Sequence, residues 1–339
     1  MRNASLIQDA RGDIDYDEEG SGPTILFVPG SWGTRSAWRG VITALTDQFR
    51  IVTMSLLGYG GTAERRTAAD FSIELEAEII EAVGRRAGRR VHLVGHSYGG
   101  QACLAVAIRE IVPLISLCVI EPTELNLLRR AGDLALYEQL VTCRDVYFRA
   151  FESGDKQAAR HVIDLHDGDG SFDALPSRVR DYVIATTATN ILDWRSAFGF
   201  DAPLTIYSGI AVPSLVIRGG RGHPYVARSA EILKGAMPNV SLVTVSEAAH
   251  SMMATHAAEV ARLIGDHVSK AAVLTEYVTA TRQDAKLHRF SSRSGFLSQA
   301  PCRLLTFRNV RSCGALRGIA DIERTVIEPP HQRAELRAA

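Results

Sequence analysis

Short apolar runs recur through the first 269 residues of the chain, and they lack the polar alternation of half-exposed strands. Continuous runs of this length are typical of strands that are buried on both faces of a parallel sheet. The runs that predict strands are Thr24–Val28, Ile51–Met54, Val91–Val94, Ile115–Ile120, Ser214–Ile217 and Val240–Val245.

Helical and hairpin patterns lie between and before these runs. Apolar residues spaced three and four apart predict a helix over Phe71–Val83, which Gly84 and Gly88 are expected to end. Leu6–Asp17 alternates around an Arg-Gly pair and predicts an antiparallel hairpin. Because strands and helices alternate along the chain, the sequence predicts a doubly wound, mostly parallel α/β sheet.

The strand pattern stops between Pro122 and Tyr207. This stretch holds 10 of the 23 Phe, Trp and Tyr residues of the chain. A helical insert between two strands predicts a lid, at about residues 123–207, and some of its aromatic side chains are expected to line a ligand cleft. The helices predicted within it are Leu125–Leu140, Cys143–Ser153, Lys156–Leu165 and Val179–Asp193.

Charge divides the chain near residue 270. Residues 270–339 hold 12 Lys and Arg against 6 Asp and Glu, whereas both totals are 38 in the whole chain. We therefore predict an α/β domain over 1–269 and a basic C-terminal extension over 270–339. The candidate motifs all lie in the first part, so residues 272–339 are expected to be dispensable for catalysis.

The overall composition narrows the class of protein. A net charge of zero gives no basic surplus, so the sequence predicts no nucleic-acid partner. No apolar run reaches the ~18 residues of a membrane span, and the N-terminus lacks a signal-peptide pattern. Five scattered cysteines without a CxxC pair predict no disulfide framework and no zinc site of that kind. We expect a cytoplasmic protein with no cofactor and no metal, and we make no prediction of its oligomeric state.

The candidate chemistry lies at Ser97, within the sequence VHLVGHSYGG. GHSYG matches the pattern G-x-S-x-G, and it stands between an apolar strand and a helix-forming run, Gln101–Arg109. A tight strand–turn–helix connection with glycines on both sides of the serine is what a nucleophile elbow requires. Such a turn would hold the hydroxyl at the carboxyl edge of the sheet, where α/β folds bind ligands.

Four segments in order resemble motifs of the α/β-hydrolase superfamily. They are FVPGSWGT (27–34) for the oxyanion loop, SLLGYGGTAERRT (55–67) for the loop after the next strand, GHSYGG for the elbow, and EAAHSMMATHAAEV (247–260) for the segment of the catalytic His. Pro29 stands where His is more usual, and Ser55 replaces an Asp. The resemblance covers about residues 1–269 and implies the fold and the serine-hydrolase mechanism of that family.

The serine needs a base that takes its proton. His250 is the predicted base, because it lies just after the last apolar run and matches the family segment. His256, six residues later, is the alternative. His96 is expected to point away along the turn, and His223 has no counterpart in the family.

The base in turn needs a carboxylate that orients it. In most members of the family the acid follows the strand after the lid, but Gly222 occupies that place and no carboxylate occurs over residues 214–230. Some members place the acid at the end of the preceding strand, which here ends in Glu121. We predict Glu121 as the acid, with Glu124 as the alternative.

An oxyanion hole needs two donors aimed at the developing negative charge. The backbone N–H of Tyr98, directly after the nucleophile, is the first predicted donor. The second is expected from the loop after the first sheet strand, at Ser31 or Trp32.

These features predict a serine hydrolase that cleaves a carboxylic ester, or a related small acyl compound with an apolar or aromatic part, through an acyl-enzyme. A C–C bond hydrolase or a cofactor-free perhydrolase with the same three residues is the alternative within the fold. A non-catalytic small-molecule receptor is the alternative from another class. An epoxide hydrolase or dehalogenase is disfavoured, because those enzymes place an Asp at the elbow.

Overall fold

The computed structural model describes residues 5–88 and 90–273. The predicted C-terminal extension therefore lies outside the described residues, apart from its first four positions. Those positions belong to a helix over 257–273, which continues through residue 270. Ala271 is buried in this helix, so the packed part of the chain extends at least that far.

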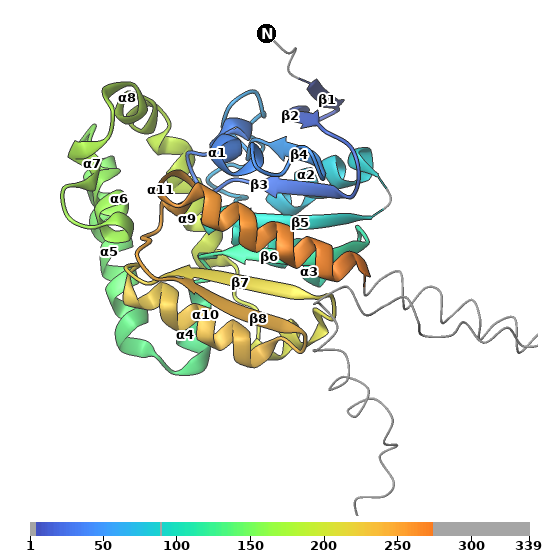
Figure 1. The fold of residues 1–339 in the computed structure, drawn as a ribbon. Helices are drawn as coiled ribbons and strands as arrows, with labels where there is room; N and C mark the ends of the chain where they lie inside the picture. Colours follow the sequence, from blue (N-terminus) through green and yellow to red (C-terminus); the bar gives the residue numbers. More distant parts are fainter. Residues whose placement is uncertain (1–4, 89, 274–339) are drawn as a thin grey trace, which may run out of the picture. The chain divides into compact units, whose positions relative to one another are not determined.

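One sheet of eight strands carries the fold, in the order β1-β2-β4-β3-β5-β6-β7-β8 (Figure 1). The strands are β1 (Ser5–Asp9), β2 (Gly12–Glu19), β3 (Thr24–Val28), β4 (Arg50–Met54), β5 (Val91–His96), β6 (Leu114–Ile120), β7 (Ser214–Gly219) and β8 (Val240–Val245). The pairs β1–β2 and β2–β4 are antiparallel, and all other neighbouring pairs are parallel. The predicted doubly wound, mostly parallel sheet is confirmed, and each predicted strand lies within an observed one.

Helices cover both faces of this sheet because its strands are apolar on both sides. In β3, Leu26 and Val28 pack on one face, whereas Ile25 and Phe27 pack on the other. The first face is covered by α2 (Ile73–Ala87), α3 (Ser97–Arg109) and α10 (Pro224–Ala236). The second face is covered by η1 (Arg35–Trp38), α1 (Arg39–Ile42) and the helix over 257–273.

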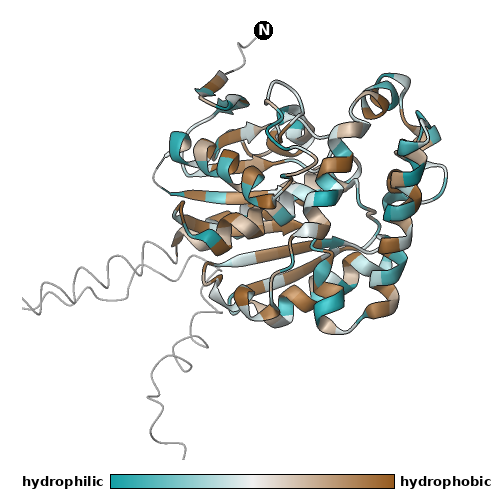
Figure 2. Ribbon diagram, turned by 180° about the vertical axis from the view of Figure 1, so that it is seen from behind, coloured by the Kyte–Doolittle hydropathy of each residue, from teal (hydrophilic) through white to brown (hydrophobic). Residues whose placement is uncertain are grey.

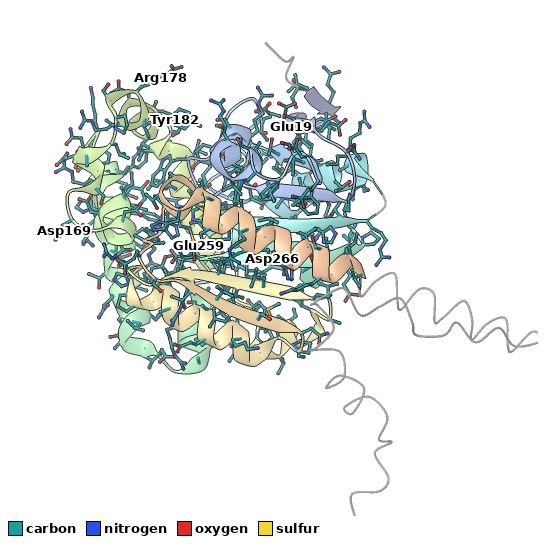
Figure 3. All side chains as sticks on the ribbon, viewed as in Figure 1. Glu19, Asp169, Arg178, Tyr182, Glu259 and Asp266 are labelled. Atoms are coloured by element: carbon teal, nitrogen blue, oxygen red, sulfur yellow. The ribbon has the colours of Figure 1, made fainter. Side chains whose placement is uncertain are left out.

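The helix over 257–273 packs on the sheet through apolar residues that recur along one of its sides. Its buried residues Val260, Ile264 and Val268 recur every four positions and face the sheet. Glu259 and Asp266 project from its outer side (Figure 3). Figure 2 shows the same division across the fold, with apolar residues concentrated on the strands and on the helix sides that meet them.

Two local predictions about the sheet and its covering helices were wrong. Gly84 does not end α2, which continues to Ala87 and ends before Gly88 at a φ of 144°. A Cβ at Gly84 would lie 3.2 Å from Val112 Cγ1, so the glycine lets α2 pack closely against the segment between α3 and β6. The strand β8 is not buried on both faces, because it forms the edge of the sheet and only Val240 and Val245 are buried.

Residues 126–209 form a helical insert between β6 and β7. It contains α4 (Asn126–Ala131), α5 (Leu134–Glu152), α6 (Arg160–Asp167), α7 (Ser171–Ala174), α8 (Ser177–Ala185), α9 (Thr187–Gly199) and η2 (Leu204–Gly209). The breaks differ from the predicted ones, since the chain turns at Gly132 with a φ of 84° and again at Thr186. Beyond β8, α11 (Met252–Thr255) follows the loop that carries His250.

Candidate active site

Ser97 lies at the sharp turn between β5 and α3, and its φ of 52° is rare for a residue with a side chain. The flanking glycines make this turn possible. A Cβ at Gly99 would lie 2.0 Å from the Pro29 carbonyl oxygen, and one at Gly95 would lie 2.5 Å from Cys103 Sγ. The elbow therefore brings the serine against the loop that follows β3.

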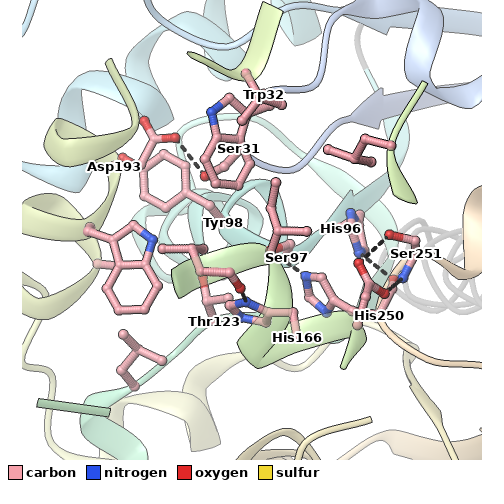
Figure 4. A pocket seen from close by; sticks show the side chains of 18 of the residues that line it. Ser31, Trp32, His96, Ser97, Tyr98, Thr123, His166, Asp193, His250 and Ser251 are labelled. Atoms are coloured by element: carbon pink, nitrogen blue, oxygen red, sulfur yellow. Dashed lines mark hydrogen bonds between the residues drawn. The ribbon is translucent and has the colours of Figure 1, made fainter. Parts of the chain in front are cut away.

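His250 joins Ser97 and Glu121 in one hydrogen-bonded row. His250 Nε2 lies 2.9 Å from Ser97 Oγ, and Nδ1 lies 2.6 Å from Glu121 Oε2 (Figure 4 shows the first of these bonds). Because Nδ1 faces a carboxylate, which only accepts, Nδ1 carries the proton and Nε2 is free to accept from the serine hydroxyl. The structure thus brings together the three residues predicted as nucleophile, base and acid.

Glu121 is fully buried and is held on its other oxygen as well. Its Oε1 accepts the Gly219 N–H at 2.6 Å. A Cβ at Gly222 would lie 2.9 Å from the same oxygen, so the residue that replaces the usual acid also leaves space for Glu121. Glu121 has a φ of 44°, a strained value of the kind that clusters at functional sites.

The alternative residues have other partners. Glu124 Oε2 accepts from Gln101 Nε2 at 3.1 Å, and burial raises the pKa of Glu124 to about 8. His256 Nδ1 lies 2.8 Å from Thr255 Oγ1 in an exposed position. His223 caps α10 by accepting the N–H of the residue after Pro224.

Two further histidines enclose His250. The ring of His96 lies 4.7 Å from the His250 ring, and its Nε2 lies 3.1 Å from the His250 carbonyl oxygen. The prediction that His96 points away along the turn misses this contact. The ring of His166, from α6, lies 4.5 Å from that of His250. Burial lowers the pKa of His96 well below its ordinary value, and the nearby His250 lowers it further.

His166 is a pocket residue that the sequence did not single out. Its Nδ1 lies 2.8 Å from the Val162 carbonyl and must donate to it, so its Nε2 accepts the Tyr225 hydroxyl at 2.6 Å. Burial, together with His250, lowers the pKa of His166 to about 3. His250 is therefore flanked by two neutral rings that add no charge to it.

The next residue of the insert holds the loop of His250. Asp167 accepts the Ser251 N–H at 2.9 Å and the Ser251 hydroxyl at 2.7 Å. Two consecutive residues of the insert therefore contact two consecutive residues of this loop, as Figure 4 shows for His166, His250 and Ser251.

The predicted oxyanion residues lie together beside Ser97. Tyr98 is in the first turn of α3, where N–H groups have no partner within the helix. Among residues 5–88 and 90–273, no backbone carbonyl accepts the N–H of Ser31 or of Trp32. Both N–H groups therefore stay candidates for the second donor.

These residues open onto a cavity of about 200 Å³. Among the residues that the structure describes, no Lys or Arg lines it, and the insert contributes most of its apolar wall. The apolar lining includes Leu125, which directly precedes the insert, and the insert residues Val162, Ile163, Leu175, Val179, Val183, Trp194 and Ala197. The sequence predicts that some aromatic side chains of the insert line the cavity, and among the described residues Trp194 is the one Phe, Trp or Tyr of the insert that does so.

Within residues 5–88 and 90–273, no group of three or more His, Cys, Asp or Glu side chains is arranged to hold a metal ion. No helix of the same residues has the length and apolar character that crossing a membrane requires.

The fold and the elbow define an α/β protein with a hydrolase-type site. The chain belongs to the alpha/beta hydrolase family, whose model matches residues 25–263.

Single proteins resemble the chain either over a short segment or at low sequence identity. Over 100 residues, the chain is 36% identical to haloalkane dehalogenase 2 of Mycobacterium tuberculosis H37Rv, a segment that covers 29% of this chain and 35% of that protein. An esterase from Exiguobacterium antarcticum superposes with a TM-score of 0.64 at 14% identity, over 79% of this chain and 100% of the esterase. A thermophilic esterase from Thermogutta terrifontis gives 0.60 at 18% identity, over 80% and 99%. The match spans about a third of the curated relative, and the two structures share the fold.

Proposed function

We propose that the protein is a serine hydrolase that cleaves a carboxylic ester, or a related acyl compound, through an acyl-enzyme. The observation that carries this proposal is the row of Ser97, His250 and Glu121, with donor–acceptor distances of 2.9 and 2.6 Å. The family supports hydrolase chemistry, and the serine supports this form of it. The dehalogenase relative does not redirect the proposal, because Ser97 stands where such enzymes place an Asp.

In the first half-reaction, Ser97 Oγ attacks the carbonyl carbon of the ester while His250 Nε2 takes the hydroxyl proton. Negative charge moves to the carbonyl oxygen, where the N–H group of Tyr98 and that of Ser31 or Trp32 stabilise it. The intermediate collapses, the C–O bond to the alcohol breaks, and His250 returns the proton to the departing oxygen.

In the second half-reaction, water attacks the acyl-enzyme and gives one proton to His250. Collapse of this intermediate breaks the bond to Ser97, which recovers its proton as the acid leaves. Glu121 keeps the imidazole in the correct tautomer throughout and stabilises its positive charge in each intermediate.

The lining of the cavity supports a small, neutral acyl group. Apolar side chains of the insert favour aliphatic or aromatic groups, and the absence of Lys and Arg among the lining residues disfavours an anionic one. This argues against a C–C bond hydrolase whose substrate places a carboxylate in the cavity. We also propose that the helical insert acts as a lid over this cavity.

A panel of p-nitrophenyl esters tests this function. We expect turnover of acetate, butyrate and benzoate esters and much slower turnover of the anionic hemisuccinate, with Ser97→Ala as the control for background hydrolysis. A folded protein that hydrolyses none of these esters faster than its Ser97→Ala variant would refute the proposal.

A further inference from the structure

One buried carboxylate connects the residues around the candidate oxyanion hole. Asp193 comes from α9 of the helical insert and is 1% exposed. Its Oδ2 accepts the Ser31 hydroxyl at 2.6 Å and the Tyr59 hydroxyl at 2.7 Å. Tyr59 lies in the loop after β4, so Asp193 connects that loop with the loop after β3. Figure 4 shows the bond to Ser31.

The second oxygen of Asp193 is linked through Arg66 to Tyr98, the residue after Ser97. Oδ1 accepts Arg66 Nη1 at 2.6 Å, and the same nitrogen lies 3.3 Å from the Tyr98 hydroxyl. The Arg66 side chain is fully buried and is also held by Glu64 and by the Leu57 carbonyl. The Ser31 side chain is therefore one hydrogen bond away from Asp193, and the Tyr98 side chain is two hydrogen bonds away.

Asp193 is occupied by these partners and does not act as a ligand for substrate. Its two oxygens take bonds from Ser31, Tyr59 and Arg66, and Asn190 Nδ2 lies 3.4 Å away. The loop that it holds is strained, because Trp32 has a φ of 60°. Such backbone persists only where its surroundings fix it.

We propose that Asp193 is a positioning residue that presets the oxyanion hole, so that the hole is complete only when the helical insert is seated on the sheet. The inference rests on the proposed function. Donors that are fixed before the reaction stabilise the transition state without reorganisation, whereas a misplaced donor loses that advantage. The insert would thus control the transition state as well as the shape of the cavity.

The main test is Asp193→Asn, which keeps the shape of the side chain and removes its charge. We expect kcat for a good p-nitrophenyl ester to fall by about 10–100-fold with little change in KM, because the loss concerns the transition state. Affinity for a boronic acid, whose adduct with Ser97 places an oxygen in the hole, should fall in parallel with kcat. Asp133→Asn is the matched control, since it removes another insert carboxylate that pairs with an arginine, Arg228, away from the hole.

Ser31→Ala tests the same link if Asp193→Asn does not fold. It removes one partner of Asp193 and leaves the Ser31 N–H in place, so we expect a smaller loss in kcat and in boronate affinity. If a folded Asp193→Asn variant has the kcat and the boronate affinity of the wild type, the inference is wrong. The same result in Ser31→Ala decides the matter if Asp193→Asn does not fold. A rise in KM alone would also overturn it, by placing the effect in substrate binding. If Ser97→Ala retains full turnover, the proposed function itself fails, which is a separate result.

Discussion

The sheet and the helical insert build the candidate site in different ways. The sheet supplies Ser97, Glu121 and the loop of His250, and the local sequence around these residues explains where their side chains stand. The insert supplies His166 and Asp193, whose places depend on how whole helices dock. In the proposed mechanism, the sheet supplies the groups that react, whereas the insert supplies side chains that contact them or their neighbours.

The largest expected effect lies on the sheet side. Ser97→Ala should abolish ester turnover above background, because the hydroxyl is the nucleophile of the proposed mechanism. The far-UV circular dichroism spectrum should stay unchanged, since only one oxygen is lost. Turnover equal to wild type in a folded variant would sink the mechanism.

Glu121→Gln should have the next largest effect. An amide at this position cannot favour the Nδ1–H tautomer or stabilise the imidazolium, so kcat should fall by roughly 10³–10⁴-fold, by analogy with the triad carboxamide change. Steady-state kinetics with a p-nitrophenyl ester would measure it. A loss below tenfold would show that another carboxylate serves His250.

On the insert side, His166→Phe should have a moderate effect. The phenyl ring can still pack against His250, but it loses the bonds to the Val162 carbonyl and the Tyr225 hydroxyl. We expect kcat to fall by about tenfold, because a small displacement of a catalytic group is costly. Tyr225→Phe, which removes one of the two bonds, is the graded control and should cost less. If both variants match wild type, the insert contributes only a wall, and the contrast between the two regions disappears.

Glu124→Gln separates stability from activity. The pKa of Glu124 is about 8 in the folded protein, against an ordinary value of 4.5. Between these values the native state keeps a proton that the unfolded chain has lost, so the free energy of unfolding falls as pH rises from 4.5 to about 8. The variant should show a shallower fall in urea titrations across this range, with kcat near wild type. Glu76, whose pKa is also raised to about 8 by burial, should preserve part of the slope.

The smallest effect is expected from removal of the chain after Ala272. The cut keeps Val260, Ile264, Val268 and Ala271, which pack in the core of the domain. Activity and melting temperature should stay close to those of the full chain. An insoluble or inactive product would show that the extension takes part in folding or catalysis.

Much of the sheet was predictable because its signals are local. The apolar runs Thr24–Val28 and Val240–Val245 match β3 and β8 in full. Because Gly222 occupies the usual position of the acid and has no side chain, the sequence predicted a carboxylate elsewhere. Glu121 was the acidic residue directly at the end of a predicted strand. Its predicted approach to His250 Nδ1 is met at 2.6 Å.

The insert half was not predictable from local pattern. Nothing in the sequence around Asp193 or His166 distinguishes them from surface residues of an amphipathic helix. Their partners Ser31 and His250 lie 162 and 84 residues away in sequence, so only the tertiary packing brings them together. The prediction that the helix ends at Gly84 was wrong for a related reason, because the close packing of Gly84 against Val112 outweighs the weak helix propensity of glycine.

Covalent labelling tests whether Ser97 is a nucleophile activated by His250 and Glu121. The wild-type protein would be treated with a fluorophosphonate probe and examined by intact mass and peptide mapping, beside Ser97→Ala and Glu121→Gln. We predict a single adduct on Ser97, none in Ser97→Ala, and much slower labelling of Glu121→Gln. No adduct on folded wild-type protein, or an adduct on another residue, would show that Ser97 is not the activated nucleophile.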